Sequence, residues 1–207
     1  MPFRNKDAIL AVLAPRLPRS GTVLEVGAGT GQHAAHFGAW AATAAPDLAW
    51  LPTEADAGML PSIQAHCAGL AGVAPPVVLD VGAAPPEAWP SLPGGGECGA
   101  YSAVYAANVT HIAPWSVTLG LLVGAAARLA PGGRLFLYGP FAVDGAPATP
   151  SDAAFHASLV ARNPEWGYRD ISGDMLPAAL HAGLQLDEAP VPMPANNFVL
   201  VFRKSPA

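Results

Sequence analysis

The stretch that most constrains the fold is residues 22–31, Thr-Val-Leu-Glu-Val-Gly-Ala-Gly-Thr-Gly. A short β-branched and aliphatic run ends in a glycine-rich turn, and the Ala-rich segment 32–42 that follows is typical of a helix. Strand, glycine turn and helix in this order form the first half of a βαβ nucleotide-binding unit. Glycines let the backbone come close to a ligand, and the helix N-terminus leaves free N–H groups beside it.

The spacing of the glycines separates two kinds of nucleotide site. Gly27, Gly29 and Gly31 form Gly-x-Gly-x-Gly, and Gln32 stands where a dinucleotide fingerprint has its last glycine. With Glu25 two residues before the first glycine, the segment resembles the acidic-x-Gly-x-Gly-x-Gly motif of class I S-adenosylmethionine (AdoMet)-dependent methyltransferases. The resemblance implies that Glu25 helps orient the methionine end of AdoMet and that the three glycines lie beside it. The alternative is a glycine turn that merely links strand to helix.

Length and composition narrow the class of protein. A chain of 207 residues predicts a single domain over residues 1–207. It has no apolar run of the roughly 18 residues that a membrane helix needs, and residues 1–7 lack the features of a signal peptide. Cys67 and Cys98 form no disulfide framework, which favours the cytoplasm. A net charge of −5 without a basic cluster argues against a nucleic-acid partner.

Acidic residues occur at the ends of the next two predicted strands. Residues 48–53 predict a strand with Glu54 and Asp56 just beyond it, and residues 75–81 predict a third strand that carries Asp80. Ligands in open α/β sheets bind outside these strand ends, and a carboxylate there suits a ribose diol. In methyltransferases the ribose-binding acid lies at this point, so Glu54 is the candidate, with Asp56 in reserve or as a helix N-terminal acid. The same resemblance makes Asp80 the candidate for the adenine amino group, the alternative being a turn-initiating Asp.

The fourth strand carries the second informative stretch. Residues 101–107 predict a central strand that runs into the polar residues Asn108, Thr110 and His111. In methyltransferases the acceptor is held against the methyl group at this strand end. A helix over about 115–129 and a fifth strand over 134–140 are expected next, with Tyr138 as a residue either of the acceptor pocket or of the core. Phe141 just after that strand carries the same two alternatives.

The remaining segments follow from periodicity and turn residues. The pattern predicts helices over 5–14, 57–70, 151–162 and 173–182, a surface loop over 82–99, and final strands over 184–188 and 198–202. Ser151-Asp152 is the expected start of the 151–162 helix. Asn5 is either an N-cap or a residue that closes over the cofactor or substrate.

Several stretches together resemble the methyltransferase-like 26 family, long known only as a domain of unknown function. The matching pieces are residues 4–6, 28–33, 107–115, 137–141, 166–170 and 193–197. The resemblance implies a Rossmann-like, doubly wound α/β fold with a seven-stranded, mostly parallel sheet whose last strand is antiparallel. It also makes Asn5, Asn108, His111 and Asn196 pocket candidates and places His33 with the cofactor loop. One departure is Glu54, where the family tends to have Asp after Ser.

The sequence therefore predicts methyl transfer from AdoMet to a small, uncharged or weakly polar acceptor. His111 is the candidate general base, or else bonds the strand-end backbone. Asn108 is the second catalytic candidate and is also a candidate contact of the cofactor. Asn5, Tyr138 and Asn196 are the expected acceptor contacts, and no His/Cys/Asp cluster has metal-ligand spacing. Two alternatives remain: a non-catalytic AdoMet-binding protein that acts through a protein partner, and a nicotinamide-dependent oxidoreductase, against which the glycine spacing speaks.

Overall fold

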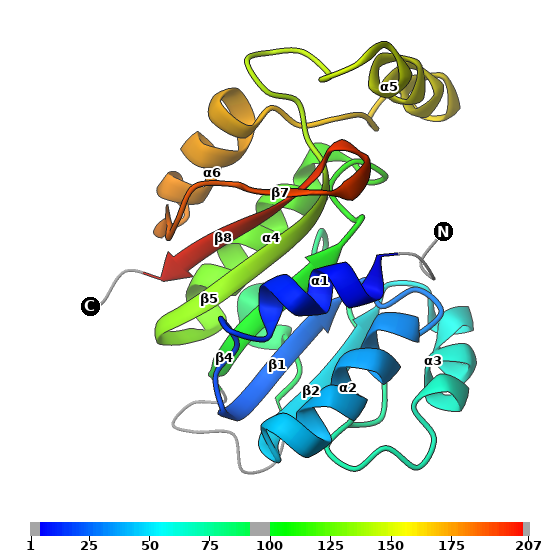
Figure 1. Ribbon diagram of the computed structural model, residues 1–207, viewed down its shortest axis with the longest axis vertical. Helices are drawn as coiled ribbons and strands as arrows, with labels where there is room; N and C mark the ends of the chain where they lie inside the picture. The colour runs from blue at the N-terminus through cyan, green and yellow to red at the C-terminus, as the bar shows by residue number, and fades with distance from the viewer. Residues whose placement is uncertain (1–4, 92–99, 205–207) are drawn as a thin grey trace.

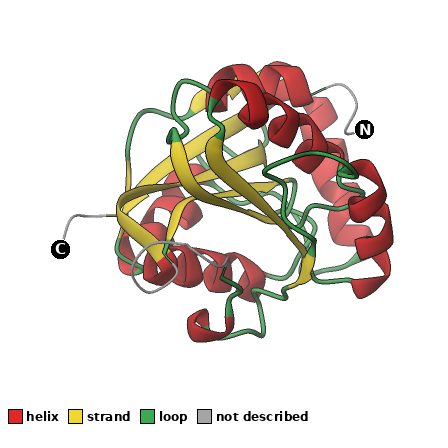
Figure 2. Ribbon diagram, turned by 90° about the horizontal axis from the view of Figure 1, so that it is seen from below, coloured by secondary structure: helices red, strands yellow, loops and turns green. Residues whose placement is uncertain are grey.

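The computed structural model describes residues 5–91 and 100–204, and within them an eight-stranded sheet carries helices on both faces (Figure 1; Figure 2). The strands are β1 Ser20–Val26, β2 Asp47–Glu54, β3 Val77–Val78, β4 Tyr101–Ala107, β5 Leu129–Pro140, β6 Leu184–Leu186, β7 Val191–Met193 and β8 Asn197–Lys204. Their order is β3-β2-β1-β4-β5-β8-β6, and β7 pairs with β8 beside β6. The first five strands run parallel and β8 runs antiparallel to β5. The expected Rossmann-like α/β class is confirmed, with β7 as one strand more than expected.

Two groups of helices cover the two faces of the sheet. The helices are α1 Lys6–Leu13, α2 Gln32–Ala44, α3 Leu60–His66, α4 Trp115–Arg128, α5 Pro150–Arg162 and α6 Leu176–His181. Shorter turns are η2 Ala57–Met59, η3 Pro86–Ala88, η5 Ile171–Met175 and η6 Pro194–Asn196. One hydrophobic core joins the sheet to α4 and α6, and a second joins it to α1, α2 and α3. Figure 1 shows α5 apart from both faces, beyond the carboxyl end of β5.

The period of two along β4 explains why this strand is central. Val104 and Ala106 pack in the core with α4, whereas Ala103 and Tyr105 pack in the core with α2. All four side chains are at most 2% exposed, as expected for a parallel strand that is covered on both faces. Because β1, β2 and β4 run parallel, their carboxyl ends lie side by side at one end of the sheet.

Some local expectations were wrong. The third strand is only two residues long, and both of its side chains are exposed at the sheet edge. The helix expected over 57–70 is divided into η2 and α3 and ends at His66. The N-cap of α5 is Thr149, whose side chain accepts a hydrogen bond from Asp152 N, so Ser151 does not cap it. The sequence did not reveal β7, a three-residue edge strand with a proline in its middle.

The loop expected over 82–99 is described as far as residue 91, and Arg4 and Cys98 lie outside the described residues. Trp89 anchors the described part: it is 2% exposed, and a Cβ added at Gly124 of α4 would lie 1.9 Å from its ring. Of the helices in residues 5–91 and 100–204, none is long and apolar enough to cross a membrane. The cytoplasmic location stays a prediction.

Candidate active site

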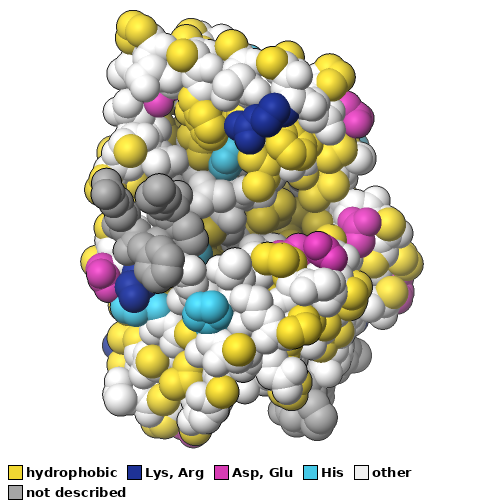
Figure 3. All heavy atoms as spheres, turned by 90° about the vertical axis from the view of Figure 1, so that its right-hand side faces the viewer, with side chains coloured by type: hydrophobic (Ala, Val, Ile, Leu, Met, Phe, Trp, Pro, Cys, Tyr) yellow, Lys and Arg dark blue, Asp and Glu magenta, His cyan; other side chains and the backbone are white. Residues whose placement is uncertain are grey.

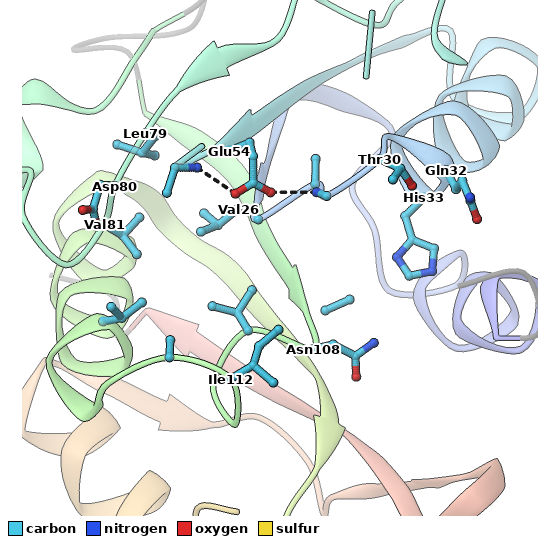
Figure 4. A pocket seen from close by; sticks show the side chains of 18 residues that line it. Val26, Thr30, Gln32, His33, Glu54, Leu79, Asp80, Val81, Asn108 and Ile112 are labelled. Carbon is cyan, nitrogen blue, oxygen red and sulfur yellow. Dashed lines mark hydrogen bonds between the residues drawn. The ribbon is translucent and has the colours of Figure 1, made fainter. Parts of the chain in front are cut away.

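Two neighbouring cavities open at the carboxyl ends of the strands. The cofactor cavity has a volume of about 570 Å³ and is lined by the glycine loop, the ends of β2 and β4, residues 79–81 and the segment before α4 (Figure 4). The acceptor cavity, of about 670 Å³, is lined by α1, α5, the ends of β4 and β5, and the β7–β8 connection. Asn108 lines both. Figure 3 shows this hollowed face of the molecule, with hydrophobic side chains along much of the hollow. Both volumes lie in the range of roughly 300–1,000 Å³ typical of small-molecule sites.

Glu54 occupies the position that the sequence predicts, at the end of β2 in the cofactor cavity. Its Oε2 accepts a hydrogen bond from Gly29 N at 2.8 Å, and its Oε1 accepts one from Ala55 N at 2.9 Å (Figure 4). Its Oε1 also accepts a longer hydrogen bond from Asp56 N at 3.5 Å. A carboxylate has about four acceptor sites, so capacity remains for a hydroxyl of a diol. The reserve candidate, Asp56, lies outside the lining and accepts from Gly58 N at 2.8 Å as the cap of η2.

The three glycines of the motif divide into two roles. Gly27 and Gly29 line the cofactor cavity, and a Cβ added at Gly29 would meet no atom within 4 Å, so the backbone there is open to a ligand. Gly31 does not line the cavity. Its φ is +91°, and an added Cβ would lie 2.6 Å from the Cα of Ile63. Gly31 therefore serves the close packing of the start of α2 against α3, a correction to the expected contact with the cofactor.

Glu25 is also placed apart from the lining of the cofactor cavity. Because side chains alternate along β1, Glu25 points to the α2 side of the sheet, where it is 2% exposed and its Oε2 accepts a hydrogen bond from Trp50 Nε1 at 2.6 Å. Burial raises the pKa of Glu25 from its ordinary 4.5 to about 7, against the lowering effect of the Trp50 bond. This carboxyl therefore lies beneath the loop and outside the cavity lining, and its role in orienting the methionine end of AdoMet stays a prediction.

Asp80 lies at the far end of the cofactor cavity from His33 (Figure 4). It lines the cavity together with Leu79 and Val81, and its Oδ1 accepts from Gly82 N at 2.9 Å. Both readings of the sequence thus describe this residue, since it forms the turn and also faces the cavity. Contact with an adenine amino group stays a prediction.

His33 lines the cofactor cavity within a buried hydrogen-bonded chain. Its Nε2 donates to Asn5 Oδ1 at 3.0 Å, so its Nδ1 accepts from the Tyr105 hydroxyl at 3.3 Å. Burial lowers the pKa of His33 to about 4, with smaller contributions from His36 and Lys6, and the ring is uncharged near neutral pH. Asn5 stands at the N-cap position of α1, as one of the two alternatives predicts, but its side chain makes no capping hydrogen bond there and lines the acceptor cavity instead.

Asn108 stands where the two cavities meet. Its φ is +59°, a left-handed conformation that Asn tolerates better than most residues, and its N–H donates to Tyr138 O at 2.8 Å. The turn at the end of β4 thus places one amide side chain in both linings.

The acceptor cavity contains most of the predicted acceptor residues. Asn5, His111 and Tyr138 line it, whereas Phe141 is buried in the core and outside the lining. His111 is 5% exposed, and burial together with the nearby Arg169 lowers its pKa to about 4. Its Nδ1 is buried and has no hydrogen-bond partner among the described residues.

Asn196 and three other residues modify the expected set. Asn196 is not in the lining, and its Nδ2 donates to Asp152 Oδ2 at 3.0 Å. Asp152, Phe155 and Tyr168 line the cavity, and the sequence did not identify them as site residues. Tyr168 lies in residues 166–170, one of the stretches that resemble the methyltransferase-like 26 family, so this resemblance could have identified it. Asp152 has no such signal, because the sequence there is typical of the start of a helix.

Arg169 holds the backbone beside this site, and the sequence did not identify it either. Its Nε donates to Thr110 O at 3.1 Å, and its Nη2 donates to Ala113 O at 2.8 Å and to Glu165 O at 2.9 Å. The guanidinium lies 5.5 Å from the centre of the Trp115 ring. It therefore fixes the segment between β4 and α4, from which His111 projects.

The charged side chains that the described part of the chain contributes to the cofactor cavity are all acidic. They are Glu54 and Asp80, and no Lys or Arg among the described residues lines the cavity. This lining suits a ligand with a cationic centre better than one with phosphates. Within the part of the chain that the structure describes, no group of three or more His, Cys, Asp or Glu side chains could hold a metal ion.

Comparison with known proteins agrees with this architecture. A family model described as "Protein of unknown function (DUF938)" matches residues 2–204. Human N-acetylserotonin methyltransferase, solved in complex with SAM, matches with a TM-score of 0.73, 14% identity, and coverage of 98% of this chain and 52% of that chain. CalO1, a methyltransferase in calicheamicin biosynthesis in its SAH-bound form, matches with a TM-score of 0.67, 17% identity and coverage of 97% and 54%.

An O-methyltransferase family protein from Burkholderia thailandensis matches with a TM-score of 0.69, 17% identity and coverage of 98% of this chain and 59% of that chain. The chain thus spans somewhat more than half the length of these solved structures. At such identities the similarity shows the fold, which is the Rossmann-like fold of AdoMet-dependent methyltransferases.

Proposed function

The chain belongs to the family described as "Protein of unknown function (DUF938)", and from that premise we propose that it is an AdoMet-dependent methyltransferase acting on a small organic acceptor. The observation that carries the proposal is the pair of cavities that meet at Asn108. One has the acids and the open glycine backbone that an AdoMet molecule needs, and the other adjoins it with room for an acceptor. The cofactors of the solved neighbours, SAM and SAH, support the same cofactor here.

The residues present fit the cofactor at three points. Glu54 would accept hydrogen bonds from the ribose hydroxyls, Asp80 would accept from the adenine amino group, and Gly29 would leave space for close approach. When bound, AdoMet supplies an electrophilic methyl group, which takes the lone pair of the acceptor while sulfur keeps the electrons of the broken bond. The protein contributes mainly alignment, which supplies about 7–11 kcal/mol in favourable cases.

His111 is the residue that would receive a proton where the acceptor atom carries one. Its Nδ1 has no hydrogen-bond partner among the described residues, and its lowered pKa keeps the ring uncharged near neutral pH. The same low pKa makes it a weaker base than an ordinary histidine. We therefore assign to it the roles of hydrogen-bond acceptor first and general base second.

Calorimetric titration with AdoMet and S-adenosylhomocysteine tests the cofactor site. We expect Glu54→Gln to weaken the binding of both by on the order of 10-fold, because hydrogen bonds to a charged group contribute about 1.5–3 kcal/mol. Asp56→Asn is the matched control, since this neighbouring acid caps η2 outside the cavity. Equal loss in both variants, or tighter binding of NADH than of AdoMet, would contradict the assignment.

Conversion of AdoMet separates the enzyme from the non-catalytic alternative. Incubation with a set of small acceptors should yield S-adenosylhomocysteine and a product heavier by one methylene, as seen by mass spectrometry. Binding without conversion across the set favours a protein that acts through a partner. We further propose that residues 1–207 act as one domain and that the chain is a relative of the methyltransferase-like 26 proteins, which it resembles in the stretches named above.

A further inference from the structure

Among the residues that the structure describes, one charged side chain lines the acceptor cavity, and it is acidic. Asp152 lies at the start of α5, among residues that are otherwise apolar, aromatic, amide or hydroxyl in character. Lys6 and Arg169 directly follow the lining residues Asn5 and Tyr168 in the chain, but neither lines the cavity. Arg169 instead donates to three backbone carbonyls. A ligand in this cavity therefore meets one negative charge that no cation among the described lining residues neutralises.

Asp152 is held in place by its neighbours. Thr149 Oγ1 donates to its Oδ2 at 2.7 Å, and Asn196 Nδ2 donates to the same oxygen at 3.0 Å. These donors are neutral, so they fix the carboxylate without cancelling its charge. Burial, and after it the neighbouring Asp152 carboxylate, raises the pKa of Tyr168 to about 12. With about four acceptor sites on a carboxylate, capacity for a further donor remains.

An aromatic wall adjoins this carboxylate. The rings of His111 and Phe155 lie 6.1 Å apart at 62°, and those of Phe155 and Tyr168 lie 6.1 Å apart at 69°. Phe155 is 40% exposed, although a large apolar ring gains from burial. Aromatic faces beside a carboxylate form an environment that attracts ammonium groups and covers apolar ligand surface.

We propose that the acceptor is a small aromatic or other apolar molecule that carries a protonated amine, with its ammonium group paired with Asp152 against the wall of His111, Phe155 and Tyr168. The inference rests on the proposed function, and it replaces the uncharged acceptor expected from the sequence. The ammonium is the anchor. The methylated atom is a different one, placed toward Asn108, where the acceptor cavity meets the cofactor cavity.

Three probes of one shape but different charge test the anchor. Phenethylamine, phenethyl alcohol and phenylacetate are titrated near neutral pH into protein saturated with S-adenosylhomocysteine, and binding is followed by ligand-observed NMR. We expect the amine to bind on the order of 10-fold more tightly than the alcohol, and phenylacetate to bind most weakly. Asp152→Asn should remove the preference for the amine, because Asn keeps the polar contacts and loses the charge.

Two further variants make the result specific. Asp47→Asn changes an exposed acid at the opposite end of β2 and should leave the preference intact. Phe155→Leu keeps the carboxylate and should weaken the amine more than the alcohol. Equal binding of amine and alcohol, a preference that survives Asp152→Asn, or no binding of any probe would overturn the proposal. An amine preference in protein that does not bind S-adenosylhomocysteine would retain the cation site and refute the methyltransferase function.

Discussion

Substitution of Ala at three glycines separates the packing role of the glycine motif from its ligand role. Gly31 combines a φ of +91° with a Cβ position 2.6 Å from the Cα of Ile63, so both the backbone and the contact oppose a side chain. Left-handed strain costs about 1–2 kcal/mol and overpacking about 1–3 kcal/mol. We therefore expect Gly31→Ala to lower the free energy of unfolding by about 2–5 kcal/mol.

Gly29 and Gly183 supply the comparison. Gly29 has a φ of +56° and Gly183 a φ of +88°, and an added Cβ at either would meet no atom within 4 Å. Each Ala variant should therefore lose only the strain of about 1–2 kcal/mol. Gly183 ends the turn after α6, far along the chain from the cofactor cavity, and so controls for strain alone.

Denaturant unfolding with and without S-adenosylhomocysteine gives the measurement. A ligand at about 100 times its Kd stabilises by about 2.7 kcal/mol, and this gain should persist in Gly183→Ala and be lost in Gly29→Ala. If Gly31→Ala unfolds at the same denaturant concentration as Gly183→Ala, the packing argument is refuted. If Gly29→Ala keeps the full ligand stabilisation, the cofactor does not approach the loop there.

Two other perturbations test a buried carboxyl and a half-buried guanidinium. The pKa of Glu25 is raised from 4.5 to about 7, so between these pH values the native state holds more protons than the unfolded state. The contribution of Glu25 to the free energy of unfolding therefore falls as pH rises through this window, by on the order of 3 kcal/mol. Glu25→Gln should remove this pH dependence and be more stable than the unsubstituted protein above about pH 7. Urea unfolding across the pH range measures this, and an unchanged slope of stability against pH would contradict the prediction. Arg169→Lys should cost about 2 kcal/mol, because an ammonium cannot reach three carbonyls with the planar fork of a guanidinium. Arg162→Lys, which alters an exposed Arg bonded to one carbonyl, is its control, and equal unfolding midpoints for the two variants would sink the argument.

The order of secondary structure and the cofactor loop followed from local sequence. Apolar periodicity and turn residues located β1, β4, α4 and α5 to within a few residues, and the glycine spacing predicted the loop that lines the cofactor cavity. Glu54 and Asp80 were identifiable because strand ends converge at one edge in any sheet of this class. The positions of these elements, the glycine loop and the acids at strand ends each depend on a short run of residues, so they can be predicted from local sequence.

Only the tertiary structure decided which side of a strand or loop each polar residue faces. Glu25 and Gly31 belong to the motif, yet one is buried against Trp50 and the other packs on Ile63, because partners distant in sequence occupy those spaces. Asp152, Phe155 and Tyr168 come together from α5 and the loop after it, and Asn196 reaches Asp152 across 44 positions of chain. Such a set has no sequence signature, since its spacing is fixed by how α5 sits over the carboxyl ends of the strands.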